Sequence, residues 1–116
     1  MKKSICIQSV LLLFLISGYS FAGNIYTVEY EYQSEVKVYV VDYEYQADII
    51  VYVVDYEYQA KDKDCLWYYV EYEYQADAKI FFVDYEYQSD VKVFFADYEY
   101  QAGWRNKESK FIGYFK

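Results

Sequence analysis

Histidine and proline are both absent from this chain of 116 residues, and glycine is scarce. Without histidine there is no Ser-His or Cys-His pair, no zinc–histidine site and no side chain that ordinarily titrates near neutral pH. We therefore expect no enzymatic activity, and the sequence predicts no catalytic residues and no cofactor. Because Gly23, Gly103 and Gly113 are the only glycines after residue 22, the turns are not glycine-based hairpin turns.

Cysteine is equally scarce. The chain has two cysteines, and Cys6 lies in an N-terminal leader, so Cys65 is alone and an intramolecular disulfide is excluded. A lone thiol could form a disulfide dimer or act as a nucleophile. Its place in the repeat described below is otherwise taken by small or branched apolar residues, so the sequence predicts a small, buried apolar side chain.

The leader has the features of a signal peptide. Lys2 and Lys3 precede the apolar run VLLLFLI at 10–16, and Ser20-Phe21-Ala22 supplies the small residues that signal peptidase reads. The run is far shorter than the ~20 apolar residues of a membrane-spanning helix. We expect a bacterial export signal over 1–22 with cleavage after Ala22, a single domain over 23–116, and a periplasmic or secreted protein.

Positive charge is in short supply. Loss of the leader leaves 9 basic residues against 19 acidic ones, a net charge of −10. Such a charge repels nucleic acid and anionic lipid, so we expect neither as a partner, and no membrane association after cleavage. The high content of aromatic and β-branched residues excludes a disordered acidic tail.

One phrase is present six times. It reads EYEYQS at 29–34, DYEYQA at 42–47 and 55–60, EYEYQA at 71–76, DYEYQS at 84–89 and DYEYQA at 97–102. The starts are 13, 13, 16, 13 and 13 residues apart, which indicates tandem copies of one structural unit. The extra residues fall at Asp62-Lys63-Asp64, and an insertion at a corner predicts a longer loop.

Each unit begins with a strand pattern. Residues 36–41 alternate with period two and are rich in Val and Tyr, which predicts a β-strand. The side chains at 36, 38 and 40 are expected to form the core face. Unbroken alternation would bury Asp42 and Glu44 without partners, so we expect the buried face to change, with Val41, Tyr43 and Tyr45 inward. Burial is likewise the expected use of most tyrosine rings. The two halves of each strand then have different neighbours.

The corners carry Gln-Ala-Asp or a close variant, as at 46–48. These residues suit a single helical turn or an Asx-type turn, in which the Asp carboxylate accepts from nearby backbone N–H groups. The apolar segment 110–115 (KFIGYF) is expected to supply a seventh and last strand. The predicted fold class is mainly β, with seven short strands in 13-residue tandem repeats joined by tight turns.

The acidic residues suggest a metal site as an alternative. If consecutive units lie side by side, like charges form ladders that a bound ion would bridge, and oxygen ligands suit calcium. The candidate ligands are Asp42, Glu44, Asp55 and Glu57, or Asp84, Glu86, Asp97 and Glu99. No EF-hand spacing or glycine-rich calcium repeat is present, so the sequence predicts a solvated acidic face and no metal-binding residues.

The ordered combination of these features resembles the septoil knot domain family. It comprises six units ending in Gln-Ala-Asp, Gln-Ser-Asp or a close variant, a longer central corner leading into Leu66-Trp67-Tyr68, and the closing Gln101-Ala102-Gly103-Trp104-Arg105. The resemblance covers essentially all of 23–116. It implies a small, mainly β domain whose backbone forms a seven-crossing torus knot, without an established biochemical activity.

The predicted function is therefore that of an exported, monomeric, non-enzymatic structural or binding module whose partner the sequence does not name. A secreted fibre-forming or surface-adhesive protein is the alternative, because tyrosine-rich β segments without proline can stack between chains. The Asp and Glu of every repeat oppose such stacking. A calcium-binding acidic repeat protein is the other alternative.

Overall fold

Every repeat unit folds into one strand and one short helical corner. The computed structural model describes residues 23–116, so the leader predicted over 1–22 lies outside the described residues. The strands are β1 (Asn24–Thr27), β2 (Val36–Val40), β3 (Ile49–Val53), β4 (Leu66–Tyr69), β5 (Ala78–Phe82), β6 (Val91–Phe95) and β7 (Gly103–Trp104). The corners are the 3-10 turns η1 (Glu31–Gln33), η2 (Glu44–Gln46), η3 (Glu57–Ala60), η4 (Glu73–Gln75), η5 (Glu86–Gln88) and η6 (Glu99–Gln101). The predicted mainly β fold with seven strands in a repeating pattern is confirmed.

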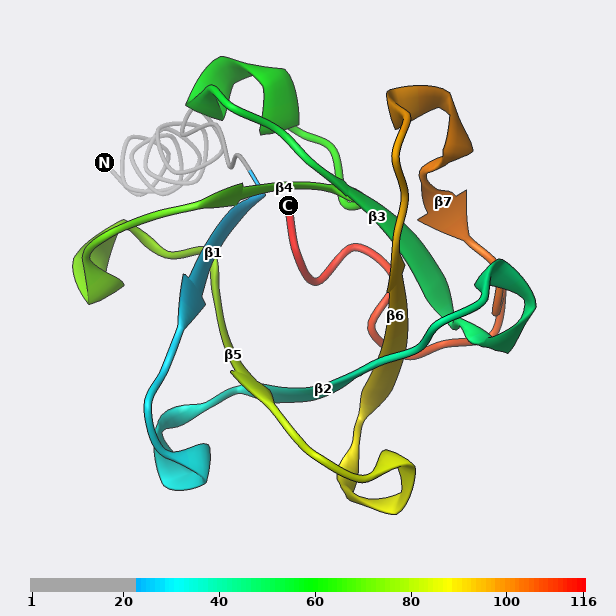
Figure 1. The fold of residues 1–116 in the computed structure, drawn as a ribbon. Helices are drawn as coiled ribbons and strands as arrows, with labels where there is room; N and C mark the ends of the chain where they lie inside the picture. Colours follow the sequence, from blue (N-terminus) through cyan, green and yellow to red (C-terminus); the bar gives the residue numbers. More distant parts are fainter. Residues whose placement is uncertain (1–22) are drawn as a thin grey trace, which may run out of the picture.

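Six of the strands close into a ring. The order is β4-β1-β5-β2-β6-β3, all neighbours are parallel, and a further pairing of β3 with β4 closes the circle (Figure 1). The chain passes round this ring twice. Strands β1 to β3 form the first circuit, and β4 to β6 fill the gaps between them on the second. Within one circuit, strands of consecutive units are therefore separated by a strand of the other circuit.

The central insertion marks the change from the first circuit to the second. The step from β3 to β4 moves the chain only one place round the ring. All the other steps between consecutive strands of the ring move it two places. The residues 61–65 between η3 and β4 accommodate this shorter step, and Asp62 adopts a left-handed conformation there with φ of 60°. The expected longer loop therefore has a topological role.

The two halves of each strand have different neighbours, as the sequence predicted. Residues 36–38 of β2 pair with 80–82 of β5, whereas residues 38–40 pair with 91–93 of β6. The first half of the strand thus pairs with one neighbour and the second half pairs with the other. The two-residue β7 instead pairs antiparallel with β3, through Gly103 opposite Ile50.

The core is made by the inward positions of all six strands, which form one cluster. The third residue of the alternating pattern is fully buried in every unit: Ile25, Val38, Val51, Trp67, Ile80 and Val93. The residue two positions earlier is buried as well, as at Val36 and Val91. The prediction was wrong for the fifth position, because Val40 is 42% exposed and Val53 37% exposed. At this point the strand ends and the chain turns out toward its corner.

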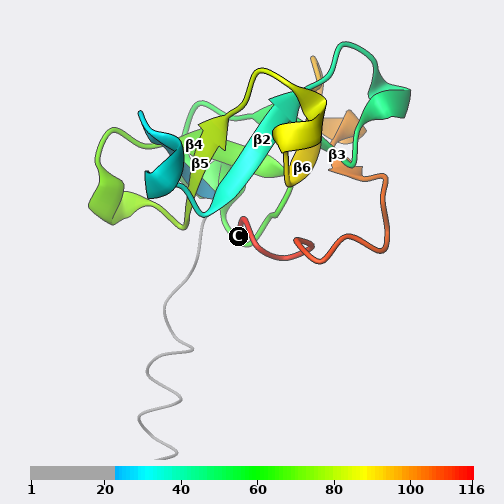
Figure 2. The same cartoon turned by 90° about the horizontal axis from the view of Figure 1, so that it is seen from below.

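The C-terminal segment is not the predicted strand. Residues 106–116 form turns that run across one face of the ring (Figures 1 and 2). Phe115 is fully buried there, with its ring 5.0 Å from that of Trp67 and 6.3 Å from that of Trp104. The apolar segment 110–115 therefore supplies one fully buried core residue and forms no ladder of backbone hydrogen bonds.

Asp64 fastens this segment to the ring. Its carboxylate accepts hydrogen bonds from the backbone N–H of Gly113 at 2.6 Å and of Phe115 at 2.8 Å, and from the indole N–H of Trp104. In the other units the corresponding acidic residue binds a strand of the other circuit, as described below. No helix among residues 23–116 is long and apolar enough to cross a membrane.

Candidate binding surface at the tyrosine corners

The repeated phrase closes each corner through its glutamine. In five of the six corners the Gln side-chain oxygen accepts a hydrogen bond from the backbone N–H three residues earlier, as Gln46 does from Tyr43 at 3.2 Å. The next backbone N–H then bonds to the glutamate carbonyl, as that of Ala47 does to Glu44 at 3.1 Å. The side chain satisfies a backbone donor that the turn would otherwise leave free, and this favours the 3-10 turn over a continued strand.

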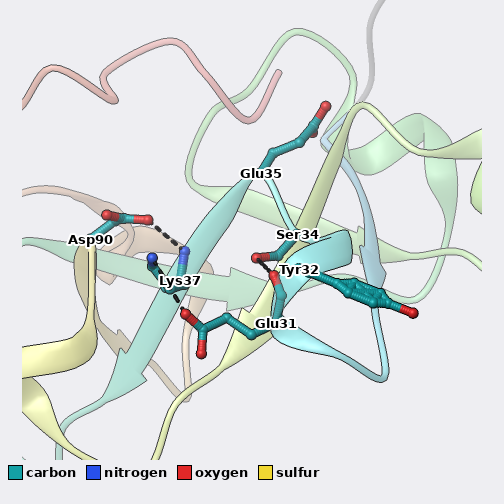
Figure 3. A pocket seen from close by; sticks show the side chains of 6 residues that line it. All are labelled: Glu31, Tyr32, Ser34, Glu35, Lys37 and Asp90. Atoms are coloured by element: carbon teal, nitrogen blue, oxygen red, sulfur yellow. Dashed lines mark hydrogen bonds and ion pairs between the residues drawn. The ribbon is translucent and has the colours of Figure 1, made fainter.

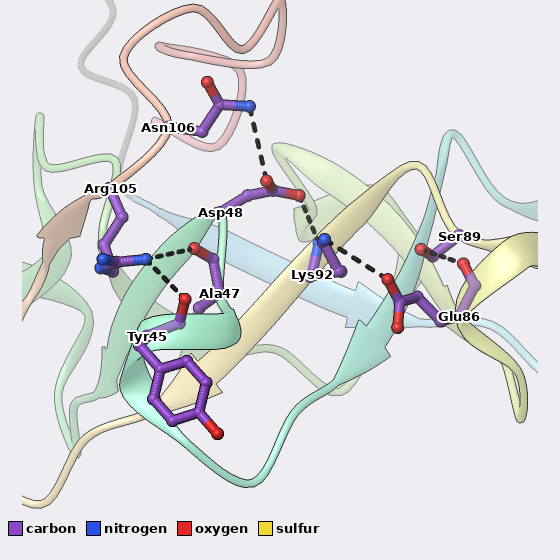
Figure 4. A network of polar contacts seen from close by, with 8 residues as sticks. All are labelled: Tyr45, Ala47, Asp48, Glu86, Ser89, Lys92, Arg105 and Asn106. Atoms are coloured by element: carbon purple, nitrogen blue, oxygen red, sulfur yellow. Dashed lines mark hydrogen bonds and ion pairs between the residues drawn. The ribbon is translucent and has the colours of Figure 1, made fainter.

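Four of the corners are followed by an acidic residue that binds the other circuit of the chain. The backbone N–H of Asp48 donates to the carbonyl of Lys92 at 2.8 Å, and the Asp48 carboxylate accepts the N–H of the same Lys92 at 2.9 Å (Figure 4). The same two-bond arrangement recurs between Glu35 and Lys79, Asp77 and Asn24, and Asp90 and Lys37. Of the two turns expected, the single helical turn forms at every corner, whereas the Asx-type turn does not, since these carboxylates hold crossing strands together and do not close their own turns.

The start of the C-terminal segment is tied to corner η2. The Arg105 guanidinium donates to the carbonyl of Tyr45 at 2.9 Å, and the Asn106 amide lies 3.4 Å from the Asp48 carboxylate (Figure 4). The backbone N–H groups of Arg105 and Asn106 both donate to the Asp48 carbonyl. Corner η2 therefore contacts both circuits and the end of the chain.

The corner tyrosines face solvent. Tyr43 is 59% and Tyr45 69% exposed, so the expectation that they point inward was wrong, although Val41 is buried and Asp42 and Glu44 are exposed as predicted. The strand ends before the phrase begins, so alternation with period two no longer governs these side chains. All six corners share this arrangement, with exposed fractions of 56% to 84%. The two rings of each pair lie 5.7 to 5.9 Å apart.

The glutamate between the two tyrosines has an ion pair at only three corners. Lys37 lies 3.6 Å from Glu31, as Figure 3 shows, and the equivalent lysine-glutamate pairs are Lys79 with Glu73 at 3.1 Å and Lys92 with Glu86 at 3.4 Å. The hydrogen bond to Glu73 raises the pKa of Lys79. Such exposed pairs contribute little to stability, because solvent screens them. Glu44, Glu57 and Glu99 have no ion pair within residues 23–116.

The corners with and without a lysine lie on opposite halves of the ring. Round the circumference the order is η3, η4, η1, η5, η2, η6, because each corner packs on a strand of the other circuit (Figure 1). Corners η4, η1 and η5 have the ion pairs, and η2, η6 and η3 lack them. The sixfold sequence repeat therefore yields a perimeter with two distinct sides.

The acidic ladders proposed for calcium do not form. Corner η6 lies between η2 and η3, which separates Asp42 and Glu44 from Asp55 and Glu57, and η2 separates the second candidate set in the same way. The described part of the chain contains no group of three or more acidic or cysteine side chains that could hold a metal ion. The ladder hypothesis was wrong because consecutive units of the same circuit are not neighbours in the ring.

Cys65 lies at the edge of the core. Its exposure is intermediate, so the predicted burial is only partial, and it packs against the core cluster as the apolar residues of its column do. Burial, reinforced by the neighbouring Asp64 carboxylate, raises the pKa of Cys65 to about 12. The thiol is therefore protonated at neutral pH, which disfavours a nucleophilic role.

The fold and the corners together define a repeat protein in which two interleaved circuits of parallel strands form a closed ring. The model of the 7(1) septoil knot domain matches residues 22–105, which is most of the chain. The chain therefore belongs to the septoil knot family, as its repeat pattern indicated. Comparison with curated proteins and with solved structures gives no match.

Proposed function

We propose that this protein is an exported, non-enzymatic structural or binding module, in which the ring is the scaffold and the tyrosine corners are the contact surface. The observation that carries the proposal is the exposure of twelve tyrosines in six pairs, whose rings are stacked at five corners and tilted at η1. Exposed aromatic side chains gathered in patches mark interaction sites on soluble proteins, and tyrosine is enriched at interfaces. A corner held by a glutamine and a crossing strand presents its rings with little loss of conformational entropy on binding.

The closed ring supports a monomer over the fibre-forming alternative. Pairing of β3 with β4 leaves no open edge in the six-stranded ring, and only the two-residue β7 lies at the end of the sheet. Long, open strand edges are what allow chains to stack on one another. The net charge of −10 after loss of the leader supports a partner that is neither nucleic acid nor an anionic membrane.

Export is tested by the N-terminus of the mature protein. Gly23 already belongs to the ring, since its N–H donates to the Ala60 carbonyl and a Cβ there would lie 2.4 Å from the Leu66 carbonyl oxygen. We expect N-terminal sequencing of the protein recovered outside the cytoplasm to begin within a residue or two of Gly23. Recovery of the uncleaved chain from a membrane fraction would contradict this prediction.

The contact role of the corners is tested by capture with matched variants. We expect the immobilised mature protein to retain a partner from the extracytoplasmic fraction of its own organism. Serine substitutions at Tyr43, Tyr45, Tyr98 and Tyr100, in the adjacent corners η2 and η6, are expected to reduce capture at least about tenfold, because the aromatic contact area is lost.

The control carries serine at Tyr30, Tyr32, Tyr85 and Tyr87, in corners that have a lysine-glutamate pair. Comparison of the two variants shows which half of the ring binds, and circular dichroism checks that both are folded. Equal capture by the wild type and both variants would contradict a contact role for the tyrosines.

A further inference from the structure

A cleft of about 620 Å³ is lined by residues of corners η3 and η4 and of β4. These two corners are neighbours in the ring (Figure 1). Its lining includes Glu57 from η3, Tyr68 from β4, and Glu71, Tyr72, Tyr74 and Gln75 from the η4 corner. This volume falls within the range of sites for small ligands. The cleft lies at the one place in the described ring where strands of consecutive units, β3 and β4, are neighbours.

A second pocket, at corner η1, shows which residue lies beside the corner glutamate in another unit. At corner η1 the pocket includes Glu31, Asp90 and Lys37 among its lining residues (Figure 3). The Lys37 ammonium lies 3.6 Å from the Glu31 carboxylate, and the Lys37 backbone N–H donates to Asp90 at 2.8 Å. A cation supplied by the chain itself thus lies beside the corner glutamate.

Asn24 takes the place of that lysine at the cleft. Its backbone N–H donates to Asp77 at 3.0 Å, as that of Lys37 does to Asp90, so the two residues are equivalent in the repeat. The Asn24 side-chain N–H₂ donates to the Glu57 carboxylate at 2.8 Å and to the Gln75 carbonyl at 3.1 Å. Glu57 therefore has a neutral partner where three other corner glutamates have a lysine.

The amide of Asn24 is also incompletely satisfied. The residue is only 7% exposed, and its two acceptors fix the orientation of the amide, because a flip would point its oxygen at two other oxygens. The buried side-chain oxygen then has no hydrogen-bond partner within residues 23–116. The amide nitrogen of the same side chain bonds to two residues that line the cleft, Glu57 and Gln75, so this part of the polar lining is incompletely satisfied.

We propose that the cleft between η3 and η4 binds an alkylammonium group. Glu57 and Glu71 supply acceptors for its N–H donors, and the Tyr72 and Tyr74 rings, stacked 5.8 Å apart, offer aromatic faces to a cation and to its methylene groups. The ligand thereby restores the charge that lysine provides at the equivalent corners. This inference deepens the proposed binding role by naming one ligand chemistry at one place, and it rests on that role.

Isothermal titration calorimetry of the mature protein with 1,5-diaminopentane, and separately with an acetylated and amidated Gly-Lys-Gly peptide, tests the proposal. A free amine and the lysine of a protein partner share the chemistry, and the stronger of the two ligands identifies the source. We expect saturable binding with Kd of about 0.1–1 mM for at least one of them, and none for the Gly-Ala-Gly peptide.

Two variants locate the site. Glu57→Gln keeps an acceptor for Asn24 but removes the charge, and it is expected to weaken binding at least about tenfold. Asn24→Lys supplies the cation internally and is expected to abolish binding. Glu44→Gln is the matched control, since it removes the same charge at the same repeat position in a corner that also lacks an ion pair, and binding should be unchanged.

Melting temperatures of all three variants establish whether they are folded. If Asn24→Lys does not fold, Glu57→Gln still tests the proposal. Absence of saturable binding, or equal weakening by Glu57→Gln and Glu44→Gln, would overturn the proposal. Neither result affects the capture experiment, which depends on tyrosines in corners η2 and η6, so failure of this inference and failure of the proposed function are distinguishable.

Discussion

Replacement of Phe115 by alanine is expected to lower the free energy of unfolding by about 3–5 kcal/mol. Phe115 is fully buried, its ring packs on Trp67 and Trp104, and its N–H donates to Asp64. Truncation would leave a cavity lined by large rigid aromatic rings, which cannot easily collapse into it. Since small domains are stable by only about 5–15 kcal/mol, the loss would be a large part of the total.

Equilibrium unfolding of the mature chain in urea measures this effect. Ile112→Ala is the matched control, because Ile112 lies in the same segment and is 48% exposed, and its truncation should change the free energy by no more than about 0.5 kcal/mol. Equal effects of the two substitutions would show that the C-terminal segment does not pack into the ring in solution.

The positions of the strands and the burial of their side chains could be predicted from the sequence. A repeat of 13 residues with alternating valines fixes where each strand lies and which residues, such as Val36 and Val38, are buried. The cost of burying Asp42 or Glu44 without a partner places them in water. These arguments need only the strand periodicity and the chemistry of single side chains, so they hold whatever the strands pair with.

The order of strands in the ring could not be predicted in this way. Pairing of β2 with β5 and β6 joins residues more than 40 positions apart, and nothing in a 13-residue period distinguishes it from pairing with β3. The only trace in the sequence is the insertion at 62–64, which marks the change of circuit. The segment 110–115 was predicted to be a strand, and it is rich in the aromatic and branched residues that are typical of strands, but its backbone forms turns that bury Phe115.

The candidate site was predicted only in its composition. The sequence identified the tyrosines and acidic residues of the corners. It also predicted that Tyr43 and Tyr45 point inward, because the alternation was assumed to continue past Val41, whereas both side chains are exposed. The cleft was missed because it depends on the pairing of β3 with β4. Asn24 could have given a signal, since it occupies the repeat position that holds lysine at 37, 79 and 92.

The most direct test of the proposed division between scaffold and contact surface compares Ile80→Ala with Tyr87→Ala by urea unfolding. Ile80 is fully buried among the inward positions of the ring, so its truncation should cost about 2–5 kcal/mol. Tyr87 is 84% exposed and contacts the ring of Tyr85 at 5.9 Å, so its truncation should cost less than about 1 kcal/mol. A loss for Tyr87→Ala as large as that for Ile80→Ala would show that the corner tyrosines hold the fold together and are not free to bind a partner.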